Sequence, residues 1–351
     1  MKNNSPTAAS RDFAITLLHV VGMVMILLCH MLQAEKIYSL SEIFISGVPL
    51  FLFISGYLAG TKKVTDFRSW FLKKVKRVWL PLAVFAIIVY GTFSLTAVYP
   101  VTPMQWLFTL LNIQGLNYTY WKFDLFYAVP GCGHFWFVTT LAFCYLLTPL
   151  MQKFKDVSVS GWRKALLVVG VLAAQLGLLF LGFQPHYILT FFFGYFLGGR
   201  VRTDGKWYCF VTVLTVLSLS VRLLARKYAD SSMIYDRYIT LISQAVIAVW
   251  IFYTIYFLKE KLPKLFNALD CKAVHFTEHI SFYFYLVHYI FLDSPIAMFN
   301  YFENRILAYL AVIVCSYVSA VLLYLLVEKV LLPLLDKPLV KQGSYKNKSE
   351  T

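Results

Sequence analysis

The sequence has few charged residues for its length. Asp, Glu, Lys and Arg make up 14% of the 351 residues, whereas soluble domains carry about 25%. Hydrophobic residues make up 60%, and the mean hydropathy is +0.68. Polar residues form no stretch long enough for a separate soluble domain. This composition excludes an ordinary soluble enzyme and indicates an integral membrane protein.

Cysteine pairs and internal repeats are also lacking. The six cysteines form no CxxC pair and have no histidine at metal-ligand spacing, so we expect neither a disulfide framework nor a metal site. The absence of a repeat argues against a transporter built from inverted halves. The cysteines are Cys29, Cys132, Cys144, Cys209, Cys271 and Cys315.

Apolar segments, in contrast, are abundant. A helix needs about 20 apolar residues to cross about 30 Å of hydrocarbon. Segments of this kind predict an all-α integral membrane fold, a bundle of about ten transmembrane helices. They are 13–33, 43–60, 79–99, 134–151, 165–183, 186–200, 207–224, 239–258, 276–296 and 306–327. The shorter run 103–115 is predicted to be a helix at the membrane interface.

Basic residues are unevenly divided between the connections. If the N-terminus is inside, most Lys and Arg fall in inner connections, as expected for cytoplasmic loops. We therefore predict a cell-membrane protein in which a multi-span domain, 13–333, lies between cytoplasmic segments 1–12 and 334–351. This topology accounts for the net charge of +15. The expected partner is the lipid bilayer, and no nucleic-acid-binding module is present to suggest another.

Histidines stand out among the few polar residues of the predicted spans. His19 and His30 are 11 residues apart, so on a helix they share a face to within about 20° and lie about 16 Å apart. An ionisable group in hydrocarbon is costly, and it tends to line a cavity or to bond another helix. We expect His19 and His30 to face one cavity. His134 and His288 also fall in the outer halves of their spans, so three rings could meet there.

Five sequence elements then occur in a recognisable order. They are SGVPLFLFISGYLAG (46–60), FLKKVKRVWLP (71–81), GHFWFV (133–138), SFYFYLVHYIF (281–291) and LLYLLVEKVLLP (322–333). In this order and at these separations they resemble the membrane acyltransferase family 3, multi-helix enzymes that O-acylate bacterial surface carbohydrates. The resemblance covers nearly the whole chain. It implies an acyl-CoA donor that enters from the cytoplasm, a carbohydrate hydroxyl as acceptor, and no permanently bound cofactor.

The same resemblance implies roles for individual residues. In the family pattern, a basic residue precedes the catalytic histidine of the first span by 11 positions. His30 matches that histidine, but His19 stands where arginine or lysine is expected. Imidazole is only partly protonated near neutral pH, so a permanent cation is not guaranteed there. The family's basic pair after the second span is matched by Lys74 and Arg77, and lysine lacks the bidentate fork of arginine.

The chemistry supports the same assignment. Transfer of an acyl group from a thioester to a sugar hydroxyl needs a base for the hydroxyl proton. We predict that His30 is this base, with His19, His134 and His288 as further catalytic candidates. Whether His30 deprotonates the hydroxyl or forms an acyl-imidazole stays open. The phosphates of coenzyme A require cations, and the candidates are Lys73, Lys74, Lys76 and Arg77, for which contact with anionic lipid is the alternative.

Two other classes of function remain alternatives. A carrier or flippase for lipid-linked sugars would also be basic inside and rich in aromatic residues. The protein would be a non-catalytic membrane scaffold if the change from arginine or lysine to His19 had removed a cation that catalysis requires. Turnover of the donor separates the three, because only an acyltransferase, most simply an O-acetyltransferase using acetyl-CoA, releases free CoA in the presence of an acceptor.

Overall fold

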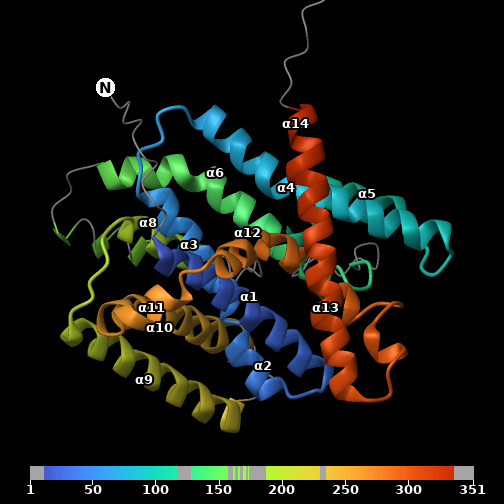
Figure 1. Cartoon of the computed structure of the whole chain (residues 1–351). Coiled ribbons are helices and arrows are strands. Elements are labelled where there is room, and N and C mark those ends of the chain that lie inside the picture. The colour runs from blue at the N-terminus through green and yellow to red at the C-terminus, as the bar shows by residue number, and fades with distance from the viewer. Residues whose placement is uncertain are drawn as a thin grey trace, which may run out of the picture.

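The computed structural model describes residues 12–116, 128–156, 187–229 and 235–335, with residues 161, 162, 165, 166, 169, 170 and 173. Within these parts every regular element is helical, so the predicted all-α fold is confirmed (Figure 1). The predicted terminal segments, 1–12 and 334–351, lie almost entirely outside the described residues.

Seven helical segments of the described chain are long and apolar enough to cross a membrane. They run through α1 (Phe13–Ala34), α2 with α3 (Tyr38–Phe44 and Gly47–Gly60), α4 (Phe67–Leu95), α6 (Trp136–Asp156), α9 (Gly205–Ala229), α10 (Thr240–Lys261) and α13 (Arg305–Tyr324). Each coincides with a predicted span. The chain is therefore a multi-pass membrane protein, although the expected count of about ten spans is not confirmed.

The other three predicted spans do not form long helices in the described residues. Segment 186–200 contains α8 (Ile188–Leu197), which has 10 residues. Segment 276–296 overlaps α12 (Lys272–Val287), which has 16 residues and begins four residues before the segment. At about 1.5 Å per residue, both are too short to cross the hydrocarbon alone. Segment 165–183 lies mostly outside the described residues. The predicted interfacial run 103–115 contains a short helix, α5 (Pro103–Leu110).

The basic run 71–81 belongs to the third long helix. The sequence places the start of that span at residue 79, but α4 begins at Phe67, where the Asp66 side chain accepts a hydrogen bond from Ser69 N at 3.1 Å. Such a cap supplies a partner for an N–H that the first turn leaves free. Pro81 lies inside the helix and deprives the Arg77 carbonyl of its helical bond. The basic side chains are therefore carried on a helix that continues into the bundle.

Contacts between distant segments define one end of the bundle. Lys259 Nζ lies 2.6 Å from Asp12 Oδ1, and Lys155 Nζ donates to the Gly60 carbonyl at 2.7 Å. Burial raises the pKa of Asp12, but hydrogen bonds from Lys259 and Ala14 N–H outweigh it, and the pKa is lowered. The start of α1 and the ends of α3, α6 and α10 thus meet. We call this the basic end, because the lysine-rich connections 62–77, 153–155, 200–206 and 259–272 adjoin it.

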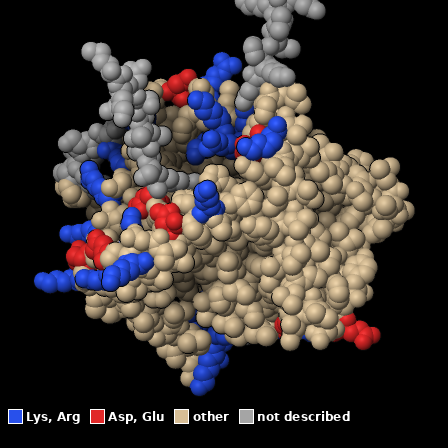
Figure 2. Space-filling model, viewed as in Figure 1, with Lys and Arg blue, Asp and Glu red and all other residues tan. Residues whose placement is uncertain are grey.

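The opposite end, which we call the histidine end, is tied together by different pairs. Tyr309 OH on α13 donates to the Met31 carbonyl at 3.3 Å, and the buried Arg222 of α9 pairs with Glu42 of α2. The end of α1 therefore meets the start of α13, and α2, which follows α1, meets the end of α9. Between the charged margins the surface shown in Figure 2 is broad and carries neither sign of charge, as expected for helices that face lipid.

Glycines bring α3 and α8 into backbone contact. Gly56 and Gly60 of α3 face α8, whose Gly194 and Gly198 face α3 in turn. A Cβ atom at Gly56 would lie 2.0 Å from the carbonyl oxygen of Phe191, so only glycine fits there. Small residues at this spacing allow helices in a membrane to approach closely. The small residues of the element SGVPLFLFISGYLAG thus admit a close neighbour.

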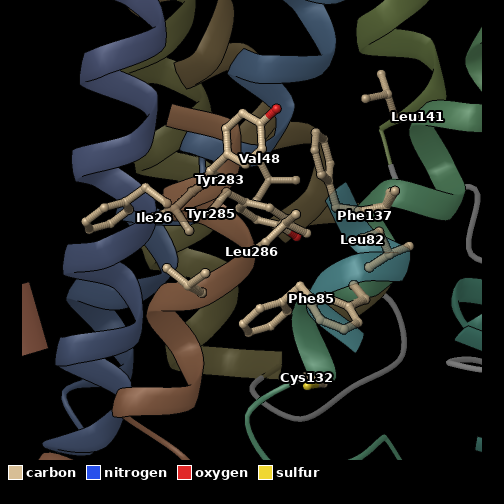
Figure 3. Close-up of a cluster of buried hydrophobic side chains, with 14 of the residues drawn as sticks. Ile26, Val48, Leu82, Phe85, Cys132, Phe137, Leu141, Tyr283, Tyr285 and Leu286 are labelled. Atoms are coloured by element: carbon tan, nitrogen blue, oxygen red, sulfur yellow. The ribbon is translucent and has the colours of Figure 1, made fainter. Parts of the chain in front are cut away.

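A cluster of buried hydrophobic side chains joins α1, α3, α4 and α12 next to the histidine end. Figure 3 shows Ile26 of α1, Val48 of α3 and Leu286 of α12 converging with Leu82 and Phe85 of α4. Leu82 and Leu286 are fully buried. Since a packed interior resists shifts of its helices, this cluster fixes the segments from which the functional side chains project.

Candidate functional site

Three histidines from separate segments meet at the histidine end. His30 lies on the last turns of α1, His134 in a 3₁₀ turn before α6 (Gly133–Phe135), and His288 at the start of another after α12 (His288–Phe291). The ring centroid of His288 is 5.2 Å from that of His30 and 5.1 Å from that of His134. The centroids of His30 and His134 are 6.4 Å apart. The structure therefore brings together the three rings that the sequence places in the outer halves of their spans.

Hydrogen bonds orient each of the three rings. His30 Nδ1 lies 2.9 Å from Gln33 Oε1, His134 Nε2 lies 3.2 Å from the Leu286 carbonyl, and His288 Nδ1 lies 2.7 Å from the Tyr285 carbonyl. Because an oxygen accepts in each pair, the bonded nitrogen carries the proton and the other is an acceptor. The second nitrogens of His134 and His288 are buried and have no hydrogen-bond partner among the residues that the structure describes. The cluster thus presents proton acceptors.

His30 lies between two cavities. The outer cavity has a volume of about 320 Å³ and a largely polar lining, His30, Gln33, Ala34, Tyr38, Tyr289, Leu292 and Asp293. The inner cavity has a volume of about 30 Å³ and is lined by Ile26, Cys29, His30, Ile45, Val48, His134, Trp136 and Tyr285. On α1, the residues that line the outer cavity, Gln33 and Ala34, follow His30. Those that line the inner cavity, Ile26 and Cys29, precede it. One ring can therefore contact molecules in both cavities.

The segment after α12 supplies side chains that the sequence did not single out. The Tyr289 ring lies against His30, with centroids 4.4 Å apart. On α12 itself, Tyr285 OH donates to the His134 carbonyl. Asp293 adds an exposed carboxylate to the outer cavity. Tyr289 follows His288 in the element SFYFYLVHYIF, and this position in the sequence could have identified it as a candidate site residue. Asp293 could have been noticed as an acid at the end of an apolar run.

His19 does not join the three rings. Its Nδ1 lies 2.8 Å from the Ile15 carbonyl and 3.9 Å from Glu278 Oε1 on α12. His19 and His30 do face the same neighbouring segment, as their spacing predicts. The expectation that both line one cavity is wrong for the two cavities at His30, neither of which His19 lines. About 16 Å separates the rings along the axis, and the buried Ile26 lies between them.

The four basic residues predicted to bind the donor lie near the basic end of α4. Lys73, Lys76 and Arg77 are exposed, whereas Lys74 is half-buried and lines a cavity of about 480 Å³ between α4, α5 and α6. The Lys74 ammonium is 5.1 Å from the ring centroid of Tyr145, close enough for a cation–π contact. Successive residues turn by about 100° on a helix, so the four side chains spread over about 160° of the α4 surface, and Lys73 and Arg77 point the same way to within about 40°.

The sequence of this bundle matches a known family model. The model, described as an acyltransferase domain, covers residues 12–325, which is most of the chain. The chain belongs to the acyltransferase family 3. No curated protein matches it, and no solved structure does. Together with the apolar helices, the match makes the protein a membrane acyltransferase.

The histidine cluster of this acyltransferase differs from a metal centre. In the parts of the chain that the structure describes, no three His, Cys, Asp or Glu side chains are arranged to hold a metal ion. His134 and His288 each use one ring nitrogen on a backbone carbonyl. What the arrangement offers is an acid–base group, His30, with a polar cavity on one side and an apolar cavity on the other.

Proposed function

We propose that this membrane acyltransferase moves an acyl group, most simply acetyl, from acyl-CoA to a hydroxyl of a cell-envelope carbohydrate such as a capsular polysaccharide or an exopolysaccharide. His30 is the general base. The observation that carries the proposal is the position of His30 between the polar outer cavity and the small inner cavity. A base in that position can contact the acceptor hydroxyl and the thioester carbon at once.

The reaction follows from the hydrogen bond that His30 makes. Nδ1 donates to Gln33 Oε1, so Nε2 is free to take the proton of the acceptor hydroxyl. As that proton leaves, the hydroxyl oxygen bonds to the acyl carbon and the C–S bond breaks. The thiolate of CoA then takes the proton from His30, which returns to its neutral form. In the alternative order, the His30 imidazole first takes the acyl group from the thioester, and the resulting acyl-imidazole then passes it to the hydroxyl.

The lining of the outer cavity supports a carbohydrate acceptor. Tyr38 and Tyr289 supply aromatic faces on which the C–H groups of a sugar ring can rest. Gln33 and Asp293 supply polar groups, and the Asp293 carboxylate can accept hydrogen bonds from sugar hydroxyls. A cavity of about 320 Å³ lies at the lower end of the range typical of small-molecule sites, about 300–1,000 Å³.

The cavity at Lys74 supports entry of the donor from the basic end. Charge-assisted contacts with phosphate suit Lys73, Lys74, Lys76 and Arg77. The cavity that Lys74 lines is also lined by Thr139, which lies on the first turn of α6, five residues beyond His134. The long thioester arm of CoA can therefore extend toward the histidines while its phosphates stay at the basic end.

Charge also orients the proposed reaction across the membrane. If the basic end is cytoplasmic, as the positive-inside rule predicts, acyl-CoA is taken from the cytoplasm and the histidine end faces outward. Both termini are then cytoplasmic. We retain an even count of about ten spans in the cell membrane, in which α8, α12 and segment 165–183 complete the seven long segments.

Release of CoA tests this function against its alternatives. The purified protein in lipid nanodiscs, given acetyl-CoA and envelope polysaccharide from a strain that lacks the gene, should release free thiol and add O-acetyl groups visible by NMR. A carrier for lipid-linked sugars or a non-catalytic scaffold would release no thiol. The polysaccharide of the parent strain should carry O-acetyl resonances that the deletion strain lacks, and identical spectra from the two strains would contradict the proposal.

A further inference from the structure

The inner cavity beside His30 is small and apolar. Its volume is about 30 Å³, whereas an apolar cavity that takes benzene, with its six carbons, measures about 150 Å³. Ile26 and Val48 wall it with exposed fractions of 3% and 4%, and no charged residue lines it. His30 and His134 also line it. The cavity therefore has room for about one methyl-sized group next to the reactive imidazole.

We propose that this inner cavity receives the end of the donor's acyl chain and restricts the enzyme to acetyl groups. The inference rests on the proposed function, since it assumes that the thioester carbon lies beside His30. With the carbon there, the acyl chain must enter one of the two cavities that His30 adjoins. The outer cavity is polar and holds the acceptor, so the apolar inner cavity takes the methyl group.

The walls of the inner cavity cannot move apart easily. Ile26, Val48 and Tyr285, which Figure 3 shows together, come from α1, α3 and α12 and belong to the buried core. At Gly47, the residue before Val48, a Cβ atom would lie 2.7 Å from the carbonyl oxygen of Gly22. The backbones of α1 and α3 are therefore in contact at the cavity. A longer chain would have to displace packed helices instead of flexible side chains.

Selectivity between acyl donors measures this restriction. For the purified protein in nanodiscs, kcat/KM for acetyl-CoA, propionyl-CoA and butyryl-CoA is obtained from thiol release with the same extracted polysaccharide as acceptor. One methylene in a tight apolar pocket is discriminated by about 10- to 200-fold. We expect propionyl-CoA to fall below acetyl-CoA by a factor in this range, and butyryl-CoA to fall further.

Enlarging the cavity should relax the selectivity. Val48→Ala removes two methyl groups from the wall, so the ratio of propionyl-CoA to acetyl-CoA turnover should rise about 10-fold or more. Val24→Ala is the matched control, because Val24 lies on α1 with 42% exposure and does not line the cavity. Ile26→Val is a milder variant that serves if Val48→Ala does not fold. It should shift the ratio in the same direction.

The outcomes separate this inference from the function on which it rests. Turnover of butyryl-CoA as fast as acetyl-CoA by the wild type, lost in His30→Ala, would overturn the acetyl restriction and leave the acyltransferase function intact. An unchanged donor ratio in folded Val48→Ala and Ile26→Val would also overturn it. If the wild type turns over none of the three donors, the proposed function fails and the acetyl restriction fails with it.

Discussion

At the scale of single residues, the histidines were the informative signal. Titratable rings in apolar segments are costly, and three of them lie at the outer ends of their segments, which made a meeting of His30, His134 and His288 predictable. Tyr289 and Asp293 could not be assigned in the same way. Their places depend on the change from α-helix to 3₁₀ turn at His288, and no periodicity in the sequence marks that change.

The error about His19 has a physical origin. An 11-residue spacing determines that two side chains share a helix face, but it says nothing of what lies between them along the axis. On α1 the space between His19 and His30 is filled by core side chains such as Ile26. The spacing therefore predicted the direction of the rings, but it did not show that core side chains separate His19 from the two cavities at His30.

Lys74 and Arg77 carry a prediction at this scale. Each charge-assisted hydrogen bond to a CoA phosphate contributes about 1.5–3 kcal/mol. In the double variant Lys74→Gln, Arg77→Gln, the KM for acetyl-CoA should therefore rise at least 10-fold with little change in kcat, since binding of the ground state and the transition state is lost alike.

The control for this variant is another pair of lysines at the basic end. Lys261→Gln, Lys264→Gln removes the same number of charges from α10 and α11 (Pro263–Leu269), away from the Lys74 cavity. Its KM should stay near the wild-type value. A KM that does not change in the Lys74, Arg77 variant would assign those residues to membrane topology and anionic lipid contact.

At the scale of elements, hydropathy located the long helices but misplaced several of their boundaries. The start of α4 was missed because the basic run lowers the hydropathy of residues 67–78, although the Asp66 cap lies before it. The length of α12 was overestimated because the apolar residues Ile290, Phe291 and Leu292 follow the end of the helix. The length of α8 was overestimated because the predicted span includes residues 198–200, although the helix ends before Gly198. Hydropathy reports solvent preference, whereas helix ends depend on caps and on turns.

The contact between α3 and α8 gives a prediction at the scale of elements. Gly56→Ala should destabilise the protein by about 1–3 kcal/mol, because the new Cβ would press on the Phe191 carbonyl and force the helices apart. Gly91→Ala on α4 is the control, since no atom lies within 4 Å of its added Cβ. Alanine there should stabilise by about 0.5–1 kcal/mol.

Thermal unfolding in detergent, followed by fluorescence-detected size-exclusion chromatography, measures both variants. The two midpoints should shift in opposite directions from the wild type. If Gly56→Ala and Gly91→Ala unfold at the same temperature, the glycine contact does not determine how α3 and α8 pack.

At the scale of the whole molecule, the uneven distribution of charge anticipated the two ends of the bundle. The lysine-rich connections adjoin one end and the histidines meet at the other, as alternating helix directions require. The number of spans could not be derived in the same way. Whether the short helices α8 and α12 form membrane spans depends on how neighbouring helices cover their ends within the hydrocarbon. Hydropathy does not report this packing.

This separation of the two ends underlies the mechanism. Under the proposed function, the donor phosphates and the acceptor hydroxyl bind at opposite ends of one bundle, and His30 is the group that both substrates reach. A protein whose only task is to hold or carry a sugar lipid would not need an imidazole with a free acceptor nitrogen between two cavities. The central claim is therefore that His30 takes the proton of the acceptor.

The most direct test is the turnover of purified His30→Ala in nanodiscs. Thiol release from acetyl-CoA in the presence of acceptor should fall by about 10²- to 10⁴-fold, the usual contribution of a proton-transfer group, while the elution profile stays that of the wild type. His279→Ala is the control, because His279 is an exposed histidine of α12 toward the basic end and should retain full activity. Wild-type turnover by folded His30→Ala would contradict the account and would leave His134 or His288 as the base.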